Sequence, residues 1–89
     1  MGFSFGQAIK ELKAGAKVTR EGWNGKGMYL LLIKGGVVTE AIDEYYGKGW
    51  GEKPTQVQDA IYMYTAQGSL VPWLASQSDV LSDDWTLYK

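Results

Sequence analysis

The stretch Arg20-Glu21-Gly22-Trp23-Asn24-Gly25-Lys26-Gly27-Met28 joins two segments of strand-like composition. It holds three glycines, one tryptophan, one amide and two cations. Ordering it costs free energy, because glycine loses more conformational freedom on folding than any other residue. One interpretation is a tight turn, since Asn-Gly is a strong hairpin signal. The other is a loop whose backbone approaches a ligand beside a stacking surface, and both fit this stretch.

Strands are predicted on either side of this stretch. Residues 16–21 alternate in character, and Val18 facing the core would place Arg20 on the same face. A cation there needs a partner, which would be a carboxylate of the fold or an anion from outside. Residues 28–34 form a continuous apolar run between glycines, which predicts a central strand buried on both faces.

The N-terminal pattern predicts an amphipathic helix over residues 4–14. Ser4 is a candidate N-cap and Gly15 a candidate terminator. The apolar residues follow helical spacing and form one stripe that we expect to cover a sheet. They are Phe5, Ala8, Ile9 and Leu12.

After the central strand the sequence is harder to interpret. Residues 37–39 suggest a short returning strand, and residues 40–46 one or two turns of helix. Residues 47–54 contain three glycines and a proline, which predict an irregular loop. Its Trp50 is interpreted as an anchor onto the body or an oligomer contact, with a ligand-contacting flap as the alternative.

The C-terminal part predicts a hairpin, a short helix and a last strand. Strands are expected over residues 59–66 and 69–73, joined by a two-residue turn at Gln67-Gly68. Pro72 places the second of them at an edge. A capping-box pattern predicts a helical turn over residues 77–82, and residues 84–88 close the chain as a strand. The result is one α+β domain, residues 1–89, with an N-terminal helix packed on an antiparallel sheet of about five strands.

The composition of the chain argues against several classes of function. The 89 residues include no cysteine and no histidine, so the usual metal ligands and the usual nucleophile–base pairs are missing. We therefore expect no metal, no cofactor and no enzyme activity. The net charge of −1 argues against a nucleic-acid polymer as partner. No apolar run reaches membrane-spanning length and no signal peptide begins the chain, so we expect a soluble intracellular protein.

Two polar-aromatic segments are candidates for a binding site: the stretch from Arg20 to Met28, and residues 71–79. If both lie at one sheet edge, Trp23 and Trp73 offer two flat surfaces suited to a nucleobase. Base stacking on an aromatic ring contributes about 1–3 kcal/mol. The alternative is that these tryptophans belong to the core.

Each predicted site residue has an expected role. Arg20 or Lys26 would meet phosphate, and Gly25 and Gly27 would let the backbone approach the ligand. Asn24, Gln77 and Asp79 would contact ribose hydroxyls or base edges. The predicted ligand-binding set is Arg20, Trp23, Asn24, Gly25, Lys26, Gly27, Met28, Trp73, Ala75, Ser76, Gln77 and Asp79.

Several motifs resemble a known family. They are Phe5-Gly6-Gln7-Ala8, Leu12-Lys13-Ala14-Gly15, Val18 to Met28, Val71 to Leu81, and Asp84-Trp85. In order and content they are similar to the Thoeris anti-defence family of the second type, small proteins of phages and prophages. The motifs cover nearly the whole chain apart from about residues 36–58.

The resemblance implies a function. Such proteins sequester glycocyclic ADP-ribose, a bacterial immune signal, without cleaving it, so that the Thoeris effector is not activated. It also implies a homo-oligomer, a tetramer, with ligand pockets at subunit interfaces, in the cytoplasm of the infected bacterial host. The alternatives are a sponge for cyclic di- or oligonucleotides of other immune systems, an enzyme that cleaves such signals, and a module that blocks an immune enzyme directly.

Overall fold

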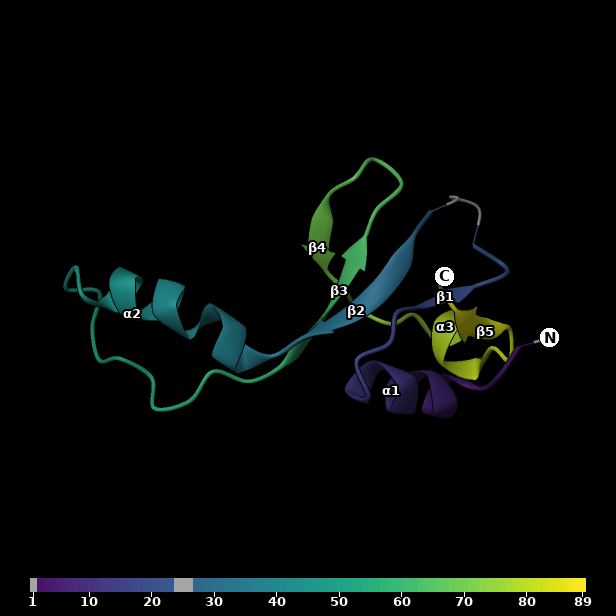
Figure 1. The fold of residues 1–89 in the computed structure, drawn as a ribbon, viewed down its shortest axis with the longest axis horizontal. Helices are drawn as coiled ribbons and strands as arrows, with labels where there is room; N and C mark the ends of the chain where they lie inside the picture. Colours follow the sequence, from purple (N-terminus) through teal and green to yellow (C-terminus); the bar gives the residue numbers. More distant parts are fainter. Residues whose placement is uncertain (1, 24–26) are drawn as a thin grey trace.

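In the computed structural model, which describes residues 2–23 and 27–89, five short strands form one antiparallel sheet (Figure 1). The spatial order of the strands is β4-β3-β2-β1-β5, so β2 is central as predicted. The strands are β1 (Val18–Arg20), β2 (Tyr29–Ile33), β3 (Ala60–Tyr64), β4 (Leu70–Pro72) and β5 (Trp85–Leu87). The predicted fold class is therefore confirmed.

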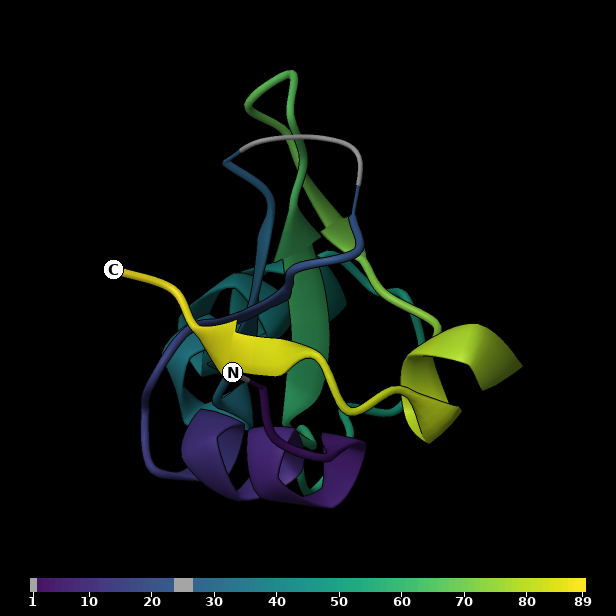
Figure 2. The ribbon, with the colours of Figure 1, turned by 90° about the vertical axis from the view of Figure 1, so that its right-hand side faces the viewer.

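Helix α1 (Phe5–Lys13) covers one face of the sheet at the β1–β5 end (Figure 2). The Ser4 hydroxyl caps it by accepting from the Gln7 amide at 3.1 Å, which confirms the predicted start. Ala8 and Leu12, on the predicted apolar stripe, are fully buried. Between the helix and the sheet lies the core of Ala8, Leu12, Val18, Leu30 and Trp85.

The second face of the sheet has no helix over it in the described residues. Tyr29 and Tyr64 are cross-strand partners and stack there with centroids 4.9 Å apart. Tyr88 packs on Tyr29 at 4.6 Å, and the Lys17 ammonium lies 4.7 Å from the same ring. Only Leu30 of β2 is fully buried. The prediction of a strand buried on both faces was wrong, because aromatic packing covers the second face only in part.

Residues 35–58, which we call the arm, project from the sheet between β2 and β3 (Figure 1). The predicted strand at residues 37–39 is wrong. The arm begins with a 3-10 helix, η1 (Gly35–Val38), followed directly by α2 (Thr39–Tyr46), which confirms the helical turns expected over residues 40–46. The Gly35 amide donates to Asp59 at 2.9 Å, and a Cβ on Gly35 would lie 1.7 Å from the Val57 carbonyl oxygen. This close approach of the two chain segments ends the strand and turns the chain outward.

Trp50, in the loop that follows α2, packs on the arm itself. Its ring stacks on that of Tyr45 with centroids 5.2 Å apart at 19°. The interpretation of Trp50 as an anchor onto the body was therefore wrong. Its interpretations as an oligomer contact and as part of a ligand-contacting flap stay predictions.

The β3–β4 hairpin has a three-residue loop rather than the predicted two-residue turn. Tyr64 pairs with Leu70, and the Thr65 amide donates to Ser69 at 2.8 Å, which leaves residues 66–68 in the loop. Gly68 takes a φ of +86°, and its amide donates to Thr65 at 2.9 Å. This is a type I turn followed by a left-handed glycine, which adds a residue to the loop. β4 lies at the sheet edge, as Pro72 predicted.

The end of the chain follows prediction. Helix α3 (Gln77–Leu81) begins with a complete capping box between Ser76 and Asp79. β5 then pairs with β1, and its Trp85 is 0% exposed. In the described part of the chain, no helix has the length and apolar composition needed to cross a membrane.

Leu30→Ala should destabilise the protein by about 2–5 kcal/mol, because it opens a cavity in the centre of the core. Urea unfolding measures the change. Leu74→Ala is the matched control: its side chain is 90% exposed, so the free energy of unfolding should change by less than about 0.5 kcal/mol. Equal effects of the two substitutions would contradict the assigned core.

Candidate functional site

The structure brings the two polar-aromatic segments together through Asp79. Its Oδ1 accepts from Arg20 Nη1 at 2.8 Å and from Trp23 Nε1 at 3.3 Å. Its Oδ2 accepts from the Ser76 amide at 3.0 Å and from the Ser76 hydroxyl at 2.9 Å. Asp79 is 8% exposed, so this carboxylate is buried with four donors around it. The segments predicted to share a site therefore lie side by side.

Arg20 has its partners within the fold, which decides between the two alternatives stated for it. Besides Asp79, it donates from Nε to Asp84 at 2.8 Å, and Asp84 also accepts from the Gly22 amide at 2.9 Å. One guanidinium thus faces two carboxylates, and the local charge is negative. Such a cluster attracts a phosphate less than a free arginine would.

The ionisation of this cluster follows from its contacts. Burial opposes the charged form of Asp79, but hydrogen bonds from the Ser76 amide, Arg20, the Ser76 hydroxyl and Trp23 outweigh it and lower its pKa. The hydrogen bond from Arg20 is the main cause of the lowered pKa of Asp84. Hydrogen bonds to Asp84 and Asp79, in that order, raise the pKa of Arg20. All three groups are charged at neutral pH.

Trp23 and Trp73 lie on Trp85, the central ring of an aromatic cluster. Trp23 meets Trp85 edge-on with centroids 5.4 Å apart at 79°, and Trp73 does so at 6.1 Å and 85°. Phe5 packs 5.5 Å from Trp85 and completes the cluster. The Trp85 Nε1–H donates to the Asp79 carbonyl at 2.9 Å. Trp23 and Trp73 are half-buried, so each supports the core and keeps part of its surface accessible.

The other predicted site residues occupy different positions. Gln77 is exposed on the first turn of α3, next to the N-cap Ser76 and the half-buried Ala75. Gly27 has a φ of +81°, and the Met28 carbonyl accepts from the Thr19 hydroxyl at 2.8 Å. Asn24, Gly25 and Lys26 lie outside the described residues.

Sequence reasoning missed Asp84 as a member of this cluster. Asp84 is named among the sequence motifs only as part of Asp84-Trp85 and has no predicted role in the site. The register pairs Arg20 with Trp85, so the residue before Trp85 lies beside the guanidinium. A cation at the end of one predicted strand and a carboxylate at the start of another were a usable signal for an ion pair. To use this signal, however, one had to know that β1 pairs with β5.

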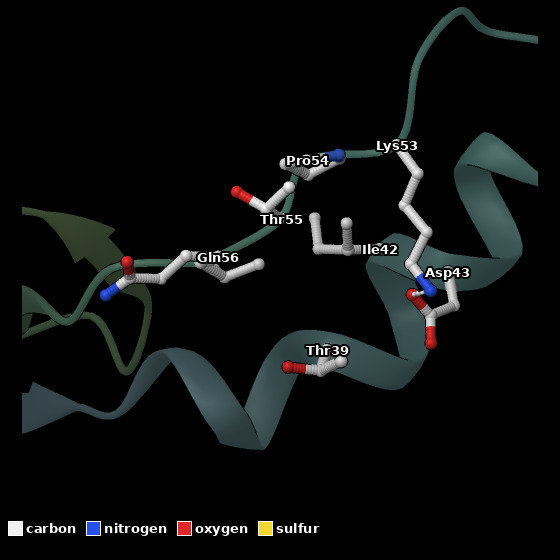
Figure 3. Close-up of a pocket in the computed structure, with 8 residues that line it drawn as sticks. Thr39, Ile42, Asp43, Lys53, Pro54, Thr55 and Gln56 are labelled. Atoms are coloured by element: carbon white, nitrogen blue, oxygen red, sulfur yellow. Dashed lines mark ion pairs between the residues drawn. The ribbon is translucent and has the colours of Figure 1, made fainter.

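Two surface hollows lie away from this cluster, along the arm. One is lined by α2 and the returning segment 53–57, where Lys53 pairs with Asp43 at 2.7 Å (Figure 3). The other, of about 450 Å³, lies at the base of the arm. None of the predicted site residues that the structure describes lines either hollow.

Arg20→Ala should lower the free energy of unfolding by roughly 3 kcal/mol, because it leaves two partly buried carboxylates without their counter-ion. Arg20→Lys should recover only part of this loss, since an ammonium cannot bridge both carboxylates in the geometry of the guanidinium. Lys13→Ala, an exposed cation on α1, is the control for loss of charge. Chemical denaturation of the four proteins measures the series, and equal stability of Arg20→Lys and the parent would contradict the bridging role.

The stabilisation from Asp79 and Asp84 should disappear in acid. A carboxyl whose folded-state pKa is lowered stabilises the protein above its unfolded pKa, and this stabilisation is lost as pH falls through the folded pKa. The window therefore lies below the ordinary carboxyl pKa of 3.8. Asp84→Asn should be less stable at pH 7 and lose less stability between about pH 5 and about pH 2. If the free energy of unfolding changes with pH in the same way for the variant and the parent, the pKa of Asp84 does not differ between the folded and unfolded states.

Comparison with known proteins finds similarity over nearly the whole chain. A family model described as the Thoeris anti-defense 2-like domain matches residues 3–88, a range that includes the arm. A protein named "Thoeris anti-defense 2" from Bacillus phage SP01 is 38% identical over 86 residues, which cover 94% of this chain and 92% of the relative. The family name indicates a phage anti-defence role against Thoeris and fits a non-enzymatic protein. The chain therefore belongs to the Thoeris anti-defense 2-like family.

Proposed function

We propose that this protein is a sponge that binds glycocyclic ADP-ribose, or a close cyclic ADP-ribose isomer, and holds it without cleaving it. The observation that carries the proposal is the convergence of two half-buried tryptophans on one side of the sheet. Trp23 and Trp73 both contact Trp85, and Asp79 joins the segments that carry them. Two aromatic surfaces near hydrogen-bonding groups suit a purine nucleotide.

The proposed roles take account of the Arg20 cluster. Lys26 is the cation assigned to phosphate, because Arg20 is engaged by Asp79 and Asp84. The exposed Gln77 and the residue Asn24 are assigned to hydroxyls or base edges. Asp79 is assigned to holding Trp23 in place rather than to the ligand, since four donors already surround its carboxylate.

The absence of histidine and cysteine from the sequence supports storage of the ligand rather than its cleavage. We place the protein in the cytoplasm of the infected host, where the signal acts, as a homo-oligomer with pockets at subunit interfaces. The small size of the chain and its exposed aromatic and aliphatic side chains support self-association.

Isothermal titration with cyclic ADP-ribose isomers tests binding. We expect a dissociation constant in the nanomolar range, about −12 kcal/mol, and failure of every isomer to bind more tightly than about 10 µM would refute the sponge. Trp23→Ala and Trp73→Ala should each weaken binding roughly 5- to 150-fold, the loss of one stacked base. Val37→Ala, an exposed substitution outside both segments, should leave affinity unchanged.

The fate of the ligand separates the sponge from an enzyme. After incubation and heat denaturation of the protein, chromatography should recover the ligand intact and in full. A linearised product would show cleavage. If a cyclic dinucleotide binds and the ADP-ribose isomers do not, the ligand is a cyclic dinucleotide and the proposed ligand is wrong.

A further inference from the structure

The glycine-rich stretch from Arg20 to Met28 is fixed at both of its ends by side chains of the sheet. At the first end, Asp84 Oδ2 accepts from the Gly22 amide at 2.9 Å. At the second end, the Thr19 hydroxyl donates to the Met28 carbonyl at 2.8 Å. Thr19 lies on β1 and Asp84 directly before β5, and both side chains are half-buried. The pairing of β1 with β5 thus supplies both contacts.

The Thr19 hydroxyl acts where the backbone ladder between β1 and β2 ends. In the described residues, the last cross-strand pair before the glycine-rich stretch is Val18 with Leu30. Beyond this pair, the hydrogen bond from Thr19 to Met28 joins residues nine positions apart. Closing a loop at its base in this way restricts the conformations of the residues between.

Gly22 is a glycine because Asp84 comes so close to it. A Cβ on Gly22 would lie 2.7 Å from Asp84 Oδ2 and 3.3 Å from Arg20 Nη2. The φ of Gly22 is not in the left-handed region, so the backbone conformation alone would accept another residue. Arg20 holds the same carboxylate through Nε at 2.8 Å. Contact between the carboxylate and the Gly22 amide therefore depends on the missing side chain.

We propose that Thr19 and Asp84 are positioning residues of the nucleotide site, which fix the two ends of the glycine-rich stretch and so present Trp23 to the ligand. This inference rests on the proposed function, in which Trp23 stacks on a base. A glycine-rich loop that is free before binding must be ordered by the ligand, and this cost weakens binding. Thr19 and Asp84 meet that cost during folding, without touching the ligand.

Isothermal titration of Thr19 variants with cyclic ADP-ribose isomers tests the second end. Thr19→Val keeps the branched shape and removes the donor, so it should raise the dissociation constant about 3- to 10-fold, as expected for one hydrogen bond. Thr19→Ser keeps the hydroxyl and should bind like the parent. The matched control is Thr39→Val, which removes a hydroxyl that donates to the Gly35 carbonyl at 3.2 Å on the arm. Equal affinities of Thr19→Val and the parent would overturn the role of Thr19.

A pair of glycine substitutions tests the first end. The Cβ of Gly22→Ala should displace the Asp84 carboxylate from the amide at position 22 and weaken binding by a similar factor, about 3- to 10-fold. Gly36→Ala is the control, because a Cβ there has no heavy atom of the described residues within 4 Å apart from neighbouring backbone. It should bind like the parent. Unchanged affinity of Gly22→Ala would overturn the role of Asp84.

Amide hydrogen exchange without nucleotide measures the positioning directly. Thr19→Val and Gly22→Ala should each speed exchange of the peptide that spans residues 20–28, whereas Thr39→Val and Gly36→Ala should not. Unchanged exchange in the first two variants would overturn the inference even where their affinity falls. Failure of the parent to bind any isomer would instead refute the sponge, and with it the role of both residues in binding.

Discussion

The structure depends on one cation held between two carboxylates. Arg20 ends β1 and reaches Asp79 on α3 and Asp84 before β5, at 2.8 Å in each case. Its side chain is 14% exposed, so the charge is largely withdrawn from water and needs both partners. Arg20 is 59 residues from Asp79 and 64 residues from Asp84 in the sequence, so the three side chains meet only in the folded chain. Their arrangement at this end of the sheet therefore rests on a set of directed hydrogen bonds as well as on burial of apolar area.

Asp79 couples this ionic cluster to the aromatic one. Its side chain accepts from Arg20 and Trp23, while its carbonyl accepts from the buried Trp85 ring. One residue thus connects Arg20 and Trp23, the start of α3 and the central ring of the core. Trp23 and Trp73 are thus held against the buried Trp85 ring. A preorganised surface of this kind would reduce the entropy lost if the proposed ligand bound there. The scaffold and the candidate site share the same contacts.

The two ends of the molecule differ in how they are stabilised. The sheet end has a closed core and a saturated polar network, whereas the arm has exposed aromatic rings and an open hollow. A chain of 89 residues without disulfides has little apolar area to spare on its surface. The Tyr45 and Trp50 rings on the arm are 52% and 60% exposed, so they bury little apolar area within the chain.

The elements with strong local signals could be predicted from the sequence alone. The Ser4 cap, the apolar stripe of α1, the central run of β2 and the Ser76–Asp79 capping box were all predictable, because each depends on residues within a few positions of one another. Convergence of the two tryptophan segments was only a condition of the predicted site, because no local pattern places two distant segments together. Tertiary structure alone decided the partners of Arg20, since pairing of β1 with β5 brings Asp84 beside it across more than sixty residues. It also decided that residues 37–39 turn into a helical arm, because the close approach of Gly35 to Val57 is a contact between distant backbones that no local pattern records.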